Sequence, residues 1–371
     1  MLQVTLKILG SDAMRRISAA ALSAAVLALP AWSQALAQAK LCDNPRQMQG
    51  FKTCADVEKA EAEGSVVQYS TDPEKGQVAL LKAFSDTFPK IKTSYVRLQA
   101  GALYAKISTE RQAKSYLADV MFISDMGMAQ DFQRRGGWRQ YISPEMAAYK
   151  PEYKSKPEGF TTWGCIIPSG IAYNPNVVKP EDAPKSWDDL LDPKWKDVTN
   201  VKVSNSGLQM AAWYVLKPIL GDSYFQKFGE NKPRAFDSYV QQYGRLIDGQ
   251  DKVIMAAQYS GYVEFKAKGA PLVFVAPATG LPSAQQSVGL VSDGPSPNAA
   301  QLYLDWFLSP LGQKAYAEVL FNHSPHADVA PPPGALPITE MKLLFPADFD
   351  DFEKKRPEFV KEWDKIIGAR K

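Results

Sequence analysis

Three short polar segments could bind a negatively charged group. They are Ser70-Thr71, Ser124-Asp125 and Ser204-Asn205-Ser206-Gly207, and each stands ahead of a stretch with helical character. A helix N-terminus presents unpaired N–H groups and about half a positive charge, so it can hold a carboxylate, phosphonate or phosphate. Taken singly, each segment is better explained by ordinary N-capping, and only their meeting at one place would favour a binding site.

Charged and aromatic side chains extend this candidate site. Arg97 closes a strand-like run and could bind a carboxylate or phosphonate through two parallel hydrogen bonds. Arg111 is an alternative, although on a helix it more often forms a surface salt bridge. The aromatic residues Tyr69, Trp163 and Tyr259 stand beside predicted strand ends, where they could form apolar walls or simply pack in the core.

Two acidic residues leave the charge of the ligand open. Asp72 and Asp125 could pair with an ammonium group of the ligand, which would then be a zwitterion, or they could cap helices. An aromatic acid and an aminoalkyl phosphonate are both compatible with these residues, and an organic anion is the leading ligand class.

The order of elements predicts how these residues meet. The pattern indicates strands at 65–70, 92–98 and 118–123, with helices at 77–88 and 101–113 between them. This alternation is typical of parallel βαβ units. Ligands bind such sheets at the carboxyl ends of the strands, so the residues after each strand should converge on one edge.

The second half of the chain continues the alternation. Strand-like runs precede helical stretches repeatedly, and no internal repeat of solenoid period is found. Predicted strands lie at 162–167, 170–174, 201–203 and 271–277, helices at 208–220, about 236–248, 298–320 and from about 348, and a strand followed by a helix across 253–265.

Composition excludes several classes of protein. The 371 residues are 45% hydrophobic and 22% charged, which is ordinary for a globular chain and unlike collagen, a coiled coil, a polytopic membrane protein or a disordered tail. The length suggests about two domains. A formal charge of +3 is too small, and too evenly spread, for a nucleic-acid binder.

Residues 1–39 predict a cleavable secretory signal. Met14-Arg15-Arg16 is basic, Ile17 to Trp32 is rich in alanine and leucine, and Ala37-Gln38-Ala39 or Ala35-Leu36-Ala37 offers a cleavage site. A membrane anchor is the alternative, but the apolar core is shorter than the ~20 residues of a spanning helix. Translation starting at Met14 is an equally open reading. We expect a periplasmic protein.

The predicted export affects the interpretation of the cysteines, because an exported protein reaches an oxidising compartment. Cys42 and Cys54 should form a disulfide in an oxidising compartment, with two free surface thiols as the alternative. Cys165 stands in an apolar run and is expected to be a buried structural thiol. The two histidines, His323 and His326, are expected to form a surface pair and not a metal site.

Several motifs, in order, resemble one family. Ala172-Tyr173-Asn174-Pro175-Asn176-Val177-Val178 is followed by Pro184-Lys185-Ser186-Trp187-Asp188-Asp189-Leu190-Leu191-Asp192-Pro193-Lys194-Trp195-Lys196. Lys268-Gly269-Ala270-Pro271, Pro297-Asn298-Ala299-Ala300, Asp305-Trp306-Phe307-Leu308-Ser309 and Gly312-Gln313 complete the pattern. Over most of the chain, it resembles the solute-binding proteins of ABC importers, in the branch related to ferric-iron, thiamine, putrescine and phosphonate binders.

The resemblance implies a type II periplasmic-binding-protein fold: two α/β lobes, two crossover segments and a ligand cleft between the lobes. The crossovers would lie near 160–173 and 274–283. The expected domains are a signal peptide at 1–39, an N-terminal segment with the disulfide at 40–64, lobe 1 at 65–159 and 284–371, and lobe 2 at 160–283. The resemblance also implies that the lobes close by a hinge motion. It further implies a monomer with an ABC permease as its partner, and neither a cofactor nor a resident metal.

The same resemblance leaves other ligands open. The ferric branch holds iron with an adjacent tyrosine pair, whereas the corresponding stretch here reads Ala257-Gln258-Tyr259-Ser260-Gly261-Tyr262 and has none. Iron transport is therefore disfavoured. A polyamine or thiamine carrier would need several cleft carboxylates. A secreted hydrolase is the remote alternative, since the chain has neither a Gly-x-Ser-x-Gly elbow nor a His-Glu-x-x-His motif.

Overall fold

The computed structural model describes residues 40–368. The predicted secretory signal at 1–39 lies outside the described residues and stays a prediction. None of the helices in the described part of the chain combines the length and the apolar character that a membrane crossing needs.

The strand and helix alternation expected for the first half of the chain is confirmed, and it continues in the second half. The strands are β1 (Arg46–Met48), β2 (Phe51–Thr53), β3 (Ser65–Ser70), β4 (Lys92–Arg97), β5 (Val120–Ile123), β6 (Trp138–Arg139), β7 (Thr162–Tyr173), β8 (Thr199–Lys202), β9 (Arg234–Phe236), β10 (Val253–Gln258), β11 (Val273–Val275), β12 (Leu281–Val291) and β13 (Leu343–Leu344). The helices are α1 (Val57–Glu63), α2 (Glu74–Thr87), α3 (Ala100–Gln112), α4 (Met126–Arg134), α5 (Gly207–Leu220), α6 (Tyr224–Glu230), α7 (Tyr239–Ile247), α8 (Tyr259–Ala267), α9 (Pro297–Leu308), α10 (Pro310–Leu320), α11 (Phe349–Lys354) and α12 (Arg356–Ile367).

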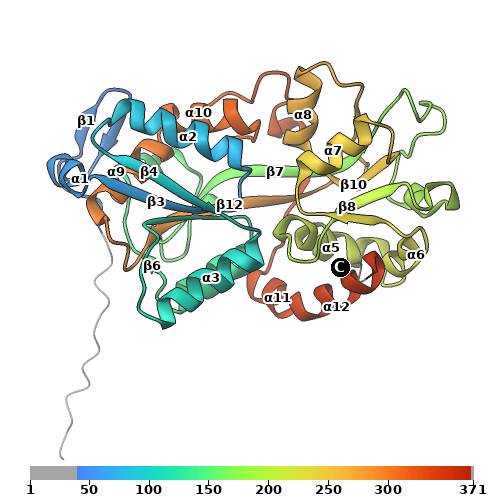
Figure 1. Cartoon of the computed structure of the whole chain (residues 1–371), viewed down its shortest axis with the longest axis horizontal. Helices are drawn as coiled ribbons and strands as arrows, with labels where there is room; N and C mark the ends of the chain where they lie inside the picture. The colour runs from blue at the N-terminus through green and yellow to red at the C-terminus, as the bar shows by residue number, and fades with distance from the viewer. Residues whose placement is uncertain (1–39, 369–371) are drawn as a thin grey trace, which may run out of the picture. The chain divides into compact units, whose positions relative to one another are not determined.

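One curled sheet runs through both halves of the described chain, in the order β4-β3-β5-β12-β7-β10-β8-β9. We call the part built on β3, β4 and β5 the first lobe, and the part built on β8, β9 and β10 the second lobe. Within each lobe these strands are parallel neighbours. Helices cover both faces, with α2 and α10 opposite α3 in the first lobe, and α7 and α8 opposite α5 and α6 in the second (Figure 1).

Two long strands, β7 and β12, join the lobes. Residues 162–168 of β7 pair with 283–288 of β12, whereas residues 169–173 pair with β10 of the second lobe. At its other end β12 pairs with β5 of the first lobe. The crossover expected near 160–173 corresponds to β7. The one expected near 274–283 comes later in the chain, at β12, because the run predicted at 271–277 forms the short strand β11 on the edge of β7.

The last helix packs on the second lobe. α12 lies against α5 and α6, while α11 lies against α4 of the first lobe. The Trp363 indole N–H donates to the backbone carbonyl of Lys202 (2.8 Å), and the Trp213 indole N–H donates to the Glu362 carboxylate (3.0 Å). The last helix, which the sequence analysis expected with the first lobe, thus packs against helices of the second.

The prediction of a single helix over 298–320 is wrong, because the helix is interrupted between α9 and α10. Pro310 has no backbone N–H to continue the α9 ladder. Ser309, just before it, takes an extended backbone conformation, and its hydroxyl accepts a hydrogen bond from the Gly312 N–H (3.3 Å). These two residues end one helix and cap the next.

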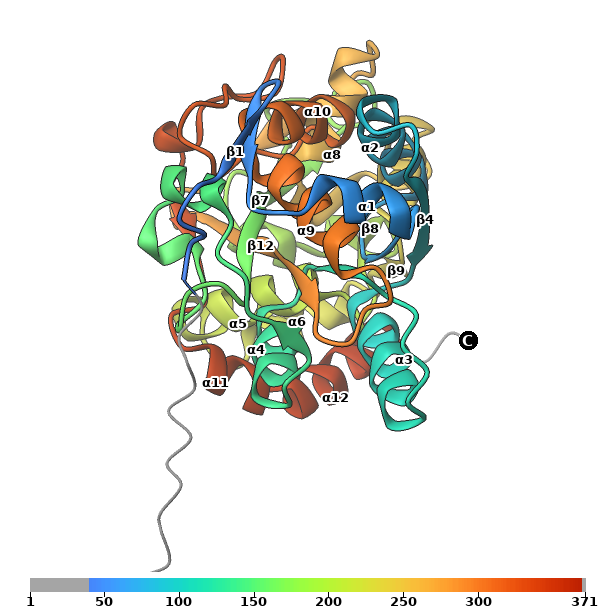
Figure 2. The same ribbon diagram turned by 90° about the vertical axis from the view of Figure 1, so that its left-hand side faces the viewer.

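The predicted Cys42–Cys54 disulfide is present, with the two Cα atoms 5.9 Å apart. It closes the segment that carries the β1–β2 hairpin, which Figure 2 shows beside α9. Asp305 of α9 fixes this segment, because its buried carboxylate accepts hydrogen bonds from the Thr53 hydroxyl (2.6 Å) and the Cys54 N–H (3.1 Å). The N-terminal segment is therefore anchored to the first lobe.

The expectation of a surface histidine pair is wrong, whereas Cys165 is buried as expected. His323 and His326 are both buried. The His323 ring stacks on Tyr259, and its Nε2 lies 2.7 Å from the Leu336 carbonyl. Burial lowers the pKa of both imidazoles, so they serve as packed, neutral side chains.

Candidate functional site

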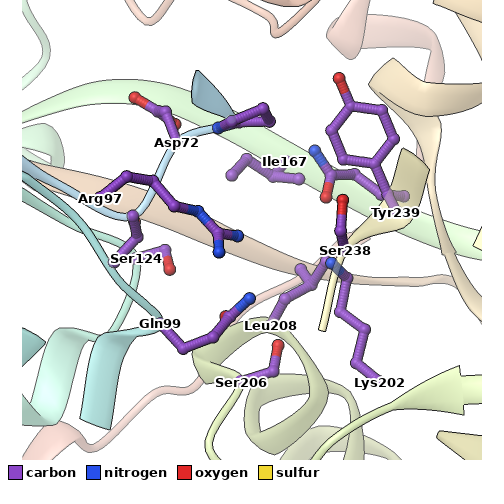
Figure 3. A pocket seen from close by; sticks show the side chains of 13 residues that line it. Asp72, Arg97, Gln99, Ser124, Ile167, Lys202, Ser206, Leu208, Ser238 and Tyr239 are labelled. Atoms are coloured by element: carbon purple, nitrogen blue, oxygen red, sulfur yellow. The ribbon is translucent and has the colours of Figure 1, made fainter. Parts of the chain in front are cut away.

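A pocket lies where the two lobes face each other. The space between its walls, including space open to solvent, measures about 470 Å³. Figure 3 shows side chains from both lobes pointing into it. Its lining residues are Thr71, Asp72, Pro73, Arg97, Gln99 and Ser124 of the first lobe, Ile167 of β7, and Lys202, Ser206, Leu208, Ser238, Tyr239 and Gln258 of the second lobe.

Helix N-termini surround the pocket. The N-cap residues of five helices line it, and Ser124 directly precedes the N-cap of a sixth, α4. These N-caps are Pro73 of α2, Gln99 of α3, Ser206 of α5, Ser238 of α7 and Gln258 of α8. The arrangement follows from the parallel strands, which all end at this edge and pass directly into helices. Six partial positive charges are thus directed at one small space.

Arg97 is a cation without a partner. It is the last residue of β4 and lies beside Ser70 of β3 in the sheet register. Its guanidinium is half-buried and points into the pocket (Figure 3), and no described residue accepts a hydrogen bond from it or pairs with it. A planar group with five free N–H donors is suited to binding a carboxylate or a tetrahedral oxyanion.

Lys202 is a second cation, from the opposite lobe. It is the last residue of β8, is 6% exposed, and its ammonium has no hydrogen-bond acceptor among the described residues. Burial, followed by repulsion from Arg97, lowers the pKa of Lys202 to about 8, while Asp237 partly opposes the shift. In the sequence, Lys202 stands between two valines in a predicted strand. Nothing in that local pattern indicates a binding role, so the sequence analysis did not predict one.

Asp72 is the acidic residue among the lining residues, and one of its oxygens is already engaged. That oxygen accepts hydrogen bonds from the hydroxyls of Tyr316 (3.0 Å) and Ser70 (3.2 Å) and from the Gln77 side-chain amide (2.9 Å). Burial raises the pKa of Asp72 to about 6, although these donors favour the carboxylate. The engaged oxygen has three donors of its own and is not free for a ligand ammonium.

Four of the residues selected from the sequence line the pocket: Thr71, Arg97, Ser124 and Ser206. Two others lie directly behind it. Ser70 is buried in the Asp72 network, and Asp125 caps α4 by accepting from the Met128 N–H (3.0 Å) while pairing with Arg356. Ser204 and Asn205 form the turn before α5 and are not lining residues.

None of the three selected aromatic residues lines the pocket. The buried Tyr69 donates its hydroxyl to the Glu110 carboxylate (3.0 Å), and Trp163 stacks on Tyr153 with ring centroids 4.7 Å apart. Tyr259 accepts a hydrogen bond from the Leu336 N–H (3.1 Å). Each is fixed by packing, so the aromatic side chain at the pocket is Tyr239 instead.

The lining residues that sequence reasoning missed share one signal. Gln99, Ser238 and Gln258 are N-caps that directly follow a strand or an extended segment. Gln99 lies two residues after the end of β4 and Gln258 is the last residue of β10, so a search that included every residue at or just after a strand end would have found both. Ser238 and Tyr239 were hidden because the short strand β9 was read as part of a helix beginning near 236.

Contacts between the lobes surround the pocket. The Gln99 side-chain amide donates to the backbone carbonyl of Asp237, and Arg356 pairs with Asp125 (2.5 Å). Lys75 of α2 pairs with Glu264 of α8, whose side chain is 1% exposed and also accepts from the Tyr239 hydroxyl (2.6 Å). These contacts hold the lobes together over the pocket.

Replacing Lys75 should loosen this closure. Lys75→Met removes one cross-lobe ion pair, and because Lys75 is half-exposed we expect dissociation of a bound solute to accelerate only about two- to fivefold. Stopped-flow tryptophan fluorescence measures the rate. Lys82→Met, on the same helix but paired with Asp86 within the first lobe, is the control and should leave the rate unchanged. Equal rates for both variants and the parent would contradict a role for Lys75 in closure.

Comparisons with known proteins agree with this architecture. The family model described as "Bacterial extracellular solute-binding protein" matches residues 69–314. An uncharacterized protein of Haemophilus influenzae is 25% identical over 278 residues, which cover 69% of this chain and 76% of that protein.

Solved structures share the fold. The periplasmic binding protein AfuA from Actinobacillus pleuropneumoniae, with fructose-6-phosphate bound, superposes with a TM-score of 0.75 at 23% identity, covering 82% of this chain and 99% of AfuA. Iron-bound HitA from Pseudomonas aeruginosa gives 0.69 at 20% identity, covering 81% and 99%. The expected type II periplasmic-binding fold is confirmed.

Proposed function

Because this chain belongs to the bacterial extracellular solute-binding proteins, we propose that it captures a small organic anion of the carboxylate or phosphonate type and delivers it to an ABC permease. In this proposal it acts as a monomer in the periplasm, which it reaches through the predicted signal at 1–39. The lobes close over the solute by hinge motion, and no bond is made or broken. The observation that carries the proposal is the unpartnered Arg97 among six helix N-termini.

The electrostatics of the pocket support an anion over a cation. Helix N-termini and Arg97 both favour negative charge. Asp72, the carboxylate among the lining residues, has hydrogen-bond donors of its own. A polyamine or thiamine carrier would need free carboxylates at these positions. AfuA, which shares the fold, is described with the anion fructose-6-phosphate bound.

Iron is the second candidate, because HitA is described as iron-bound. Hard Fe(III) needs several anionic oxygen donors. Within residues 40–368 no group of three or more His, Cys, Asp or Glu side chains is placed to hold a metal ion. The pocket tyrosine, Tyr239, donates its hydroxyl to Glu264. These observations favour the organic anion. A hydrolase is less favoured still, because the family and fold are those of binding proteins.

A thermal-shift screen of organic acids, phosphonates, amines and ferric chelates tests the proposal. At one hundred times the dissociation constant a ligand stabilises the folded state by about 2.7 kcal/mol, which the melting temperature reports. Native mass spectrometry of the purified protein would identify a retained solute. Stabilisation by amines or ferric chelates, without any response to organic acids or phosphonates, would overturn the proposal.

Arg97→Ala should weaken anion binding by about 1.5–3 kcal/mol, the range for a hydrogen bond to a charged group. The melting temperature of the empty protein should hardly change, because the guanidinium has no partner within the protein. Isothermal titration calorimetry measures the affinity. Arg135→Ala removes an exposed arginine that pairs with Asp131, and serves as the control. Parent affinity in Arg97→Ala would assign Arg97 a role outside binding.

A further inference from the structure

The pocket holds two cations that face each other from different lobes. Arg97 enters from the end of β4 and Lys202 from the end of β8, and Figure 3 shows both charged groups pointing into the same space. Neither has a hydrogen-bond acceptor or an ion-pair partner among the described residues. One unpartnered cation would suffice for a singly charged anion, so the second requires its own explanation.

No acidic group around the pocket forms an ion pair with Lys202. Asp72 accepts hydrogen bonds from Tyr316, Ser70 and Gln77, which are neutral donors and leave its negative charge in place. Asp125 pairs with Arg356, and the exposed Asp237 acts on Lys202 without forming an ion pair with it. The charged lining residues are therefore two cations, Arg97 and Lys202, and one carboxylate, Asp72, which leaves the pocket with an excess of positive charge.

A buried ammonium without a hydrogen-bond acceptor is costly, even though the Lys202 ammonium lies 6.0 Å from the centroid of the Tyr239 ring. Lys202 is 6% exposed, so it loses most of its hydration when the lobes are together. An apolar residue in place of Lys202 at the end of β8 would avoid this cost. The arrangement is favourable only when something negative occupies the space between Arg97 and Lys202.

We propose that the solute carries two negative charges at neutral pH, that these are shared between Arg97 of the first lobe and Lys202 of the second, and that Lys202 is the residue that selects doubly over singly charged anions. The inference rests on the proposed function. It names two chemical sources: a tetrahedral dianion, such as a phosphate monoester, or a dicarboxylate.

The proposal also assigns the solute a part in closure. In the empty protein the two cations repel each other, which favours separated lobes. A dianion cancels both charges and removes the repulsion as the lobes meet. A monoanion leaves one cation buried and unbalanced, so closure of the lobes should stabilise the bound monoanion less than a bound dianion.

Matched pairs of small probes test the selectivity at pH 7. Sulfate is compared with methyl sulfate, and succinate with succinamate, by calorimetry or thermal shift. In each pair the two anions are close in size and differ by one charge. The parent protein should bind the dianion of at least one pair about tenfold or more tightly than its singly charged partner. The pair that shows the preference identifies the source as tetrahedral or dicarboxylate.

The variant Lys202→Met should abolish this preference. It keeps a long apolar side chain in the strand, so the fold is retained, and it should lower dianion affinity about tenfold or more while changing monoanion affinity by less than about threefold. Lys227→Met removes an exposed lysine of α6 outside the pocket and should change neither. Small-angle scattering adds a ligand-free readout: empty Lys202→Met should be more compact than the empty parent.

Three results would overturn the inference. Equal affinity of the parent for both members of each pair would remove the charge selectivity while leaving the proposed function intact. Equal losses for dianions and monoanions in Lys202→Met would make Lys202 a general counter-charge. Failure of every anion to bind, with binding of amines or ferric chelates instead, would overturn the proposed function and this inference with it.

Discussion

Gly207→Ala is expected to weaken solute binding by about 5- to 150-fold without unfolding the empty protein. Gly207 begins α5 of the second lobe, and a Cβ added there would lie 2.4 Å from the backbone carbonyl oxygen of Ser124 in the first lobe. Backbone atoms cannot move aside as a flexible side chain would. Overpacking of this kind costs about 1–3 kcal/mol, and here the cost arises only when the lobes meet.

The control for this prediction is Gly244→Ala. Gly244 lies within α7, and an added Cβ there meets nothing within 4 Å. Calorimetry should give parent affinity for this variant. For Gly207→Ala, scattering should show a less compact liganded state, while the melting temperature of the empty protein stays near that of the parent. A marked drop in that melting temperature would mean that the Gly207–Ser124 contact persists without ligand and does not belong to closure.

Dianion affinity is expected to fall as the pH rises above 8, with a slope that approaches tenfold per pH unit, until it reaches the level expected for Lys202→Met. With the lobes together and no solute bound, burial and then repulsion from Arg97 lower the pKa of Lys202 to about 8. A bound anion favours the charged ammonium, so binding above this pH requires uptake of a proton. Calorimetry at pH 7, 8 and 9 in buffers of different ionisation enthalpy measures both the affinity and the proton uptake.

Arg97 and Asp237 are the charged groups that act on Lys202. Burial raises the pKa of Tyr239, so Tyr239 stays neutral between pH 7 and 9. Asp72 titrates near pH 6. The pH dependence should therefore disappear in Lys202→Met. A parent affinity that is flat between pH 7 and 9 would contradict the assignment to Lys202.

The stability of the empty protein should change with the opposite sign. The unfolded chain holds the Lys202 proton up to its ordinary pKa of 10.5, whereas the folded chain releases it near 8. Between these values the unfolded state binds more protons, so the free energy of unfolding rises with pH. Urea unfolding should show a Lys202 contribution of up to about 2 kcal/mol between pH 8 and 9.5, absent in Lys202→Met.

Local patterns predicted the first lobe well. The strands β3, β4 and β5 and the helices between them fall close to their predicted bounds, because short β-branched or apolar runs are separated there by longer stretches of helical character. From that order, the rule that ligands bind at strand carboxyl ends predicted one edge for Thr71, Arg97 and Ser124, and all three line the pocket. The Pro310 break between α9 and α10 was visible in the sequence, but the apolar residues on both sides concealed it.

Long-range packing could not be predicted in the same way. Nothing near Trp363 in sequence indicates that α12 lies on α5 and α6, since that contact joins segments about 150 residues apart in the chain. Tyr259 directly follows β10, whereas Trp163 lies at the start of β7, and neither residue lines the pocket. A strand end fixes where a residue lies, whereas the direction of its side chain depends on neighbours that the local pattern does not contain.

The anchoring of the N-terminal hairpin on α9 and of α12 on α5 and α6 has a practical consequence. The segment that follows residue 40 is attached to one lobe, and the helix that precedes residue 368 is attached to the other. Dyes attached close to these two positions would therefore move with different lobes. Their energy transfer would report solute capture in real time, without a label near the pocket.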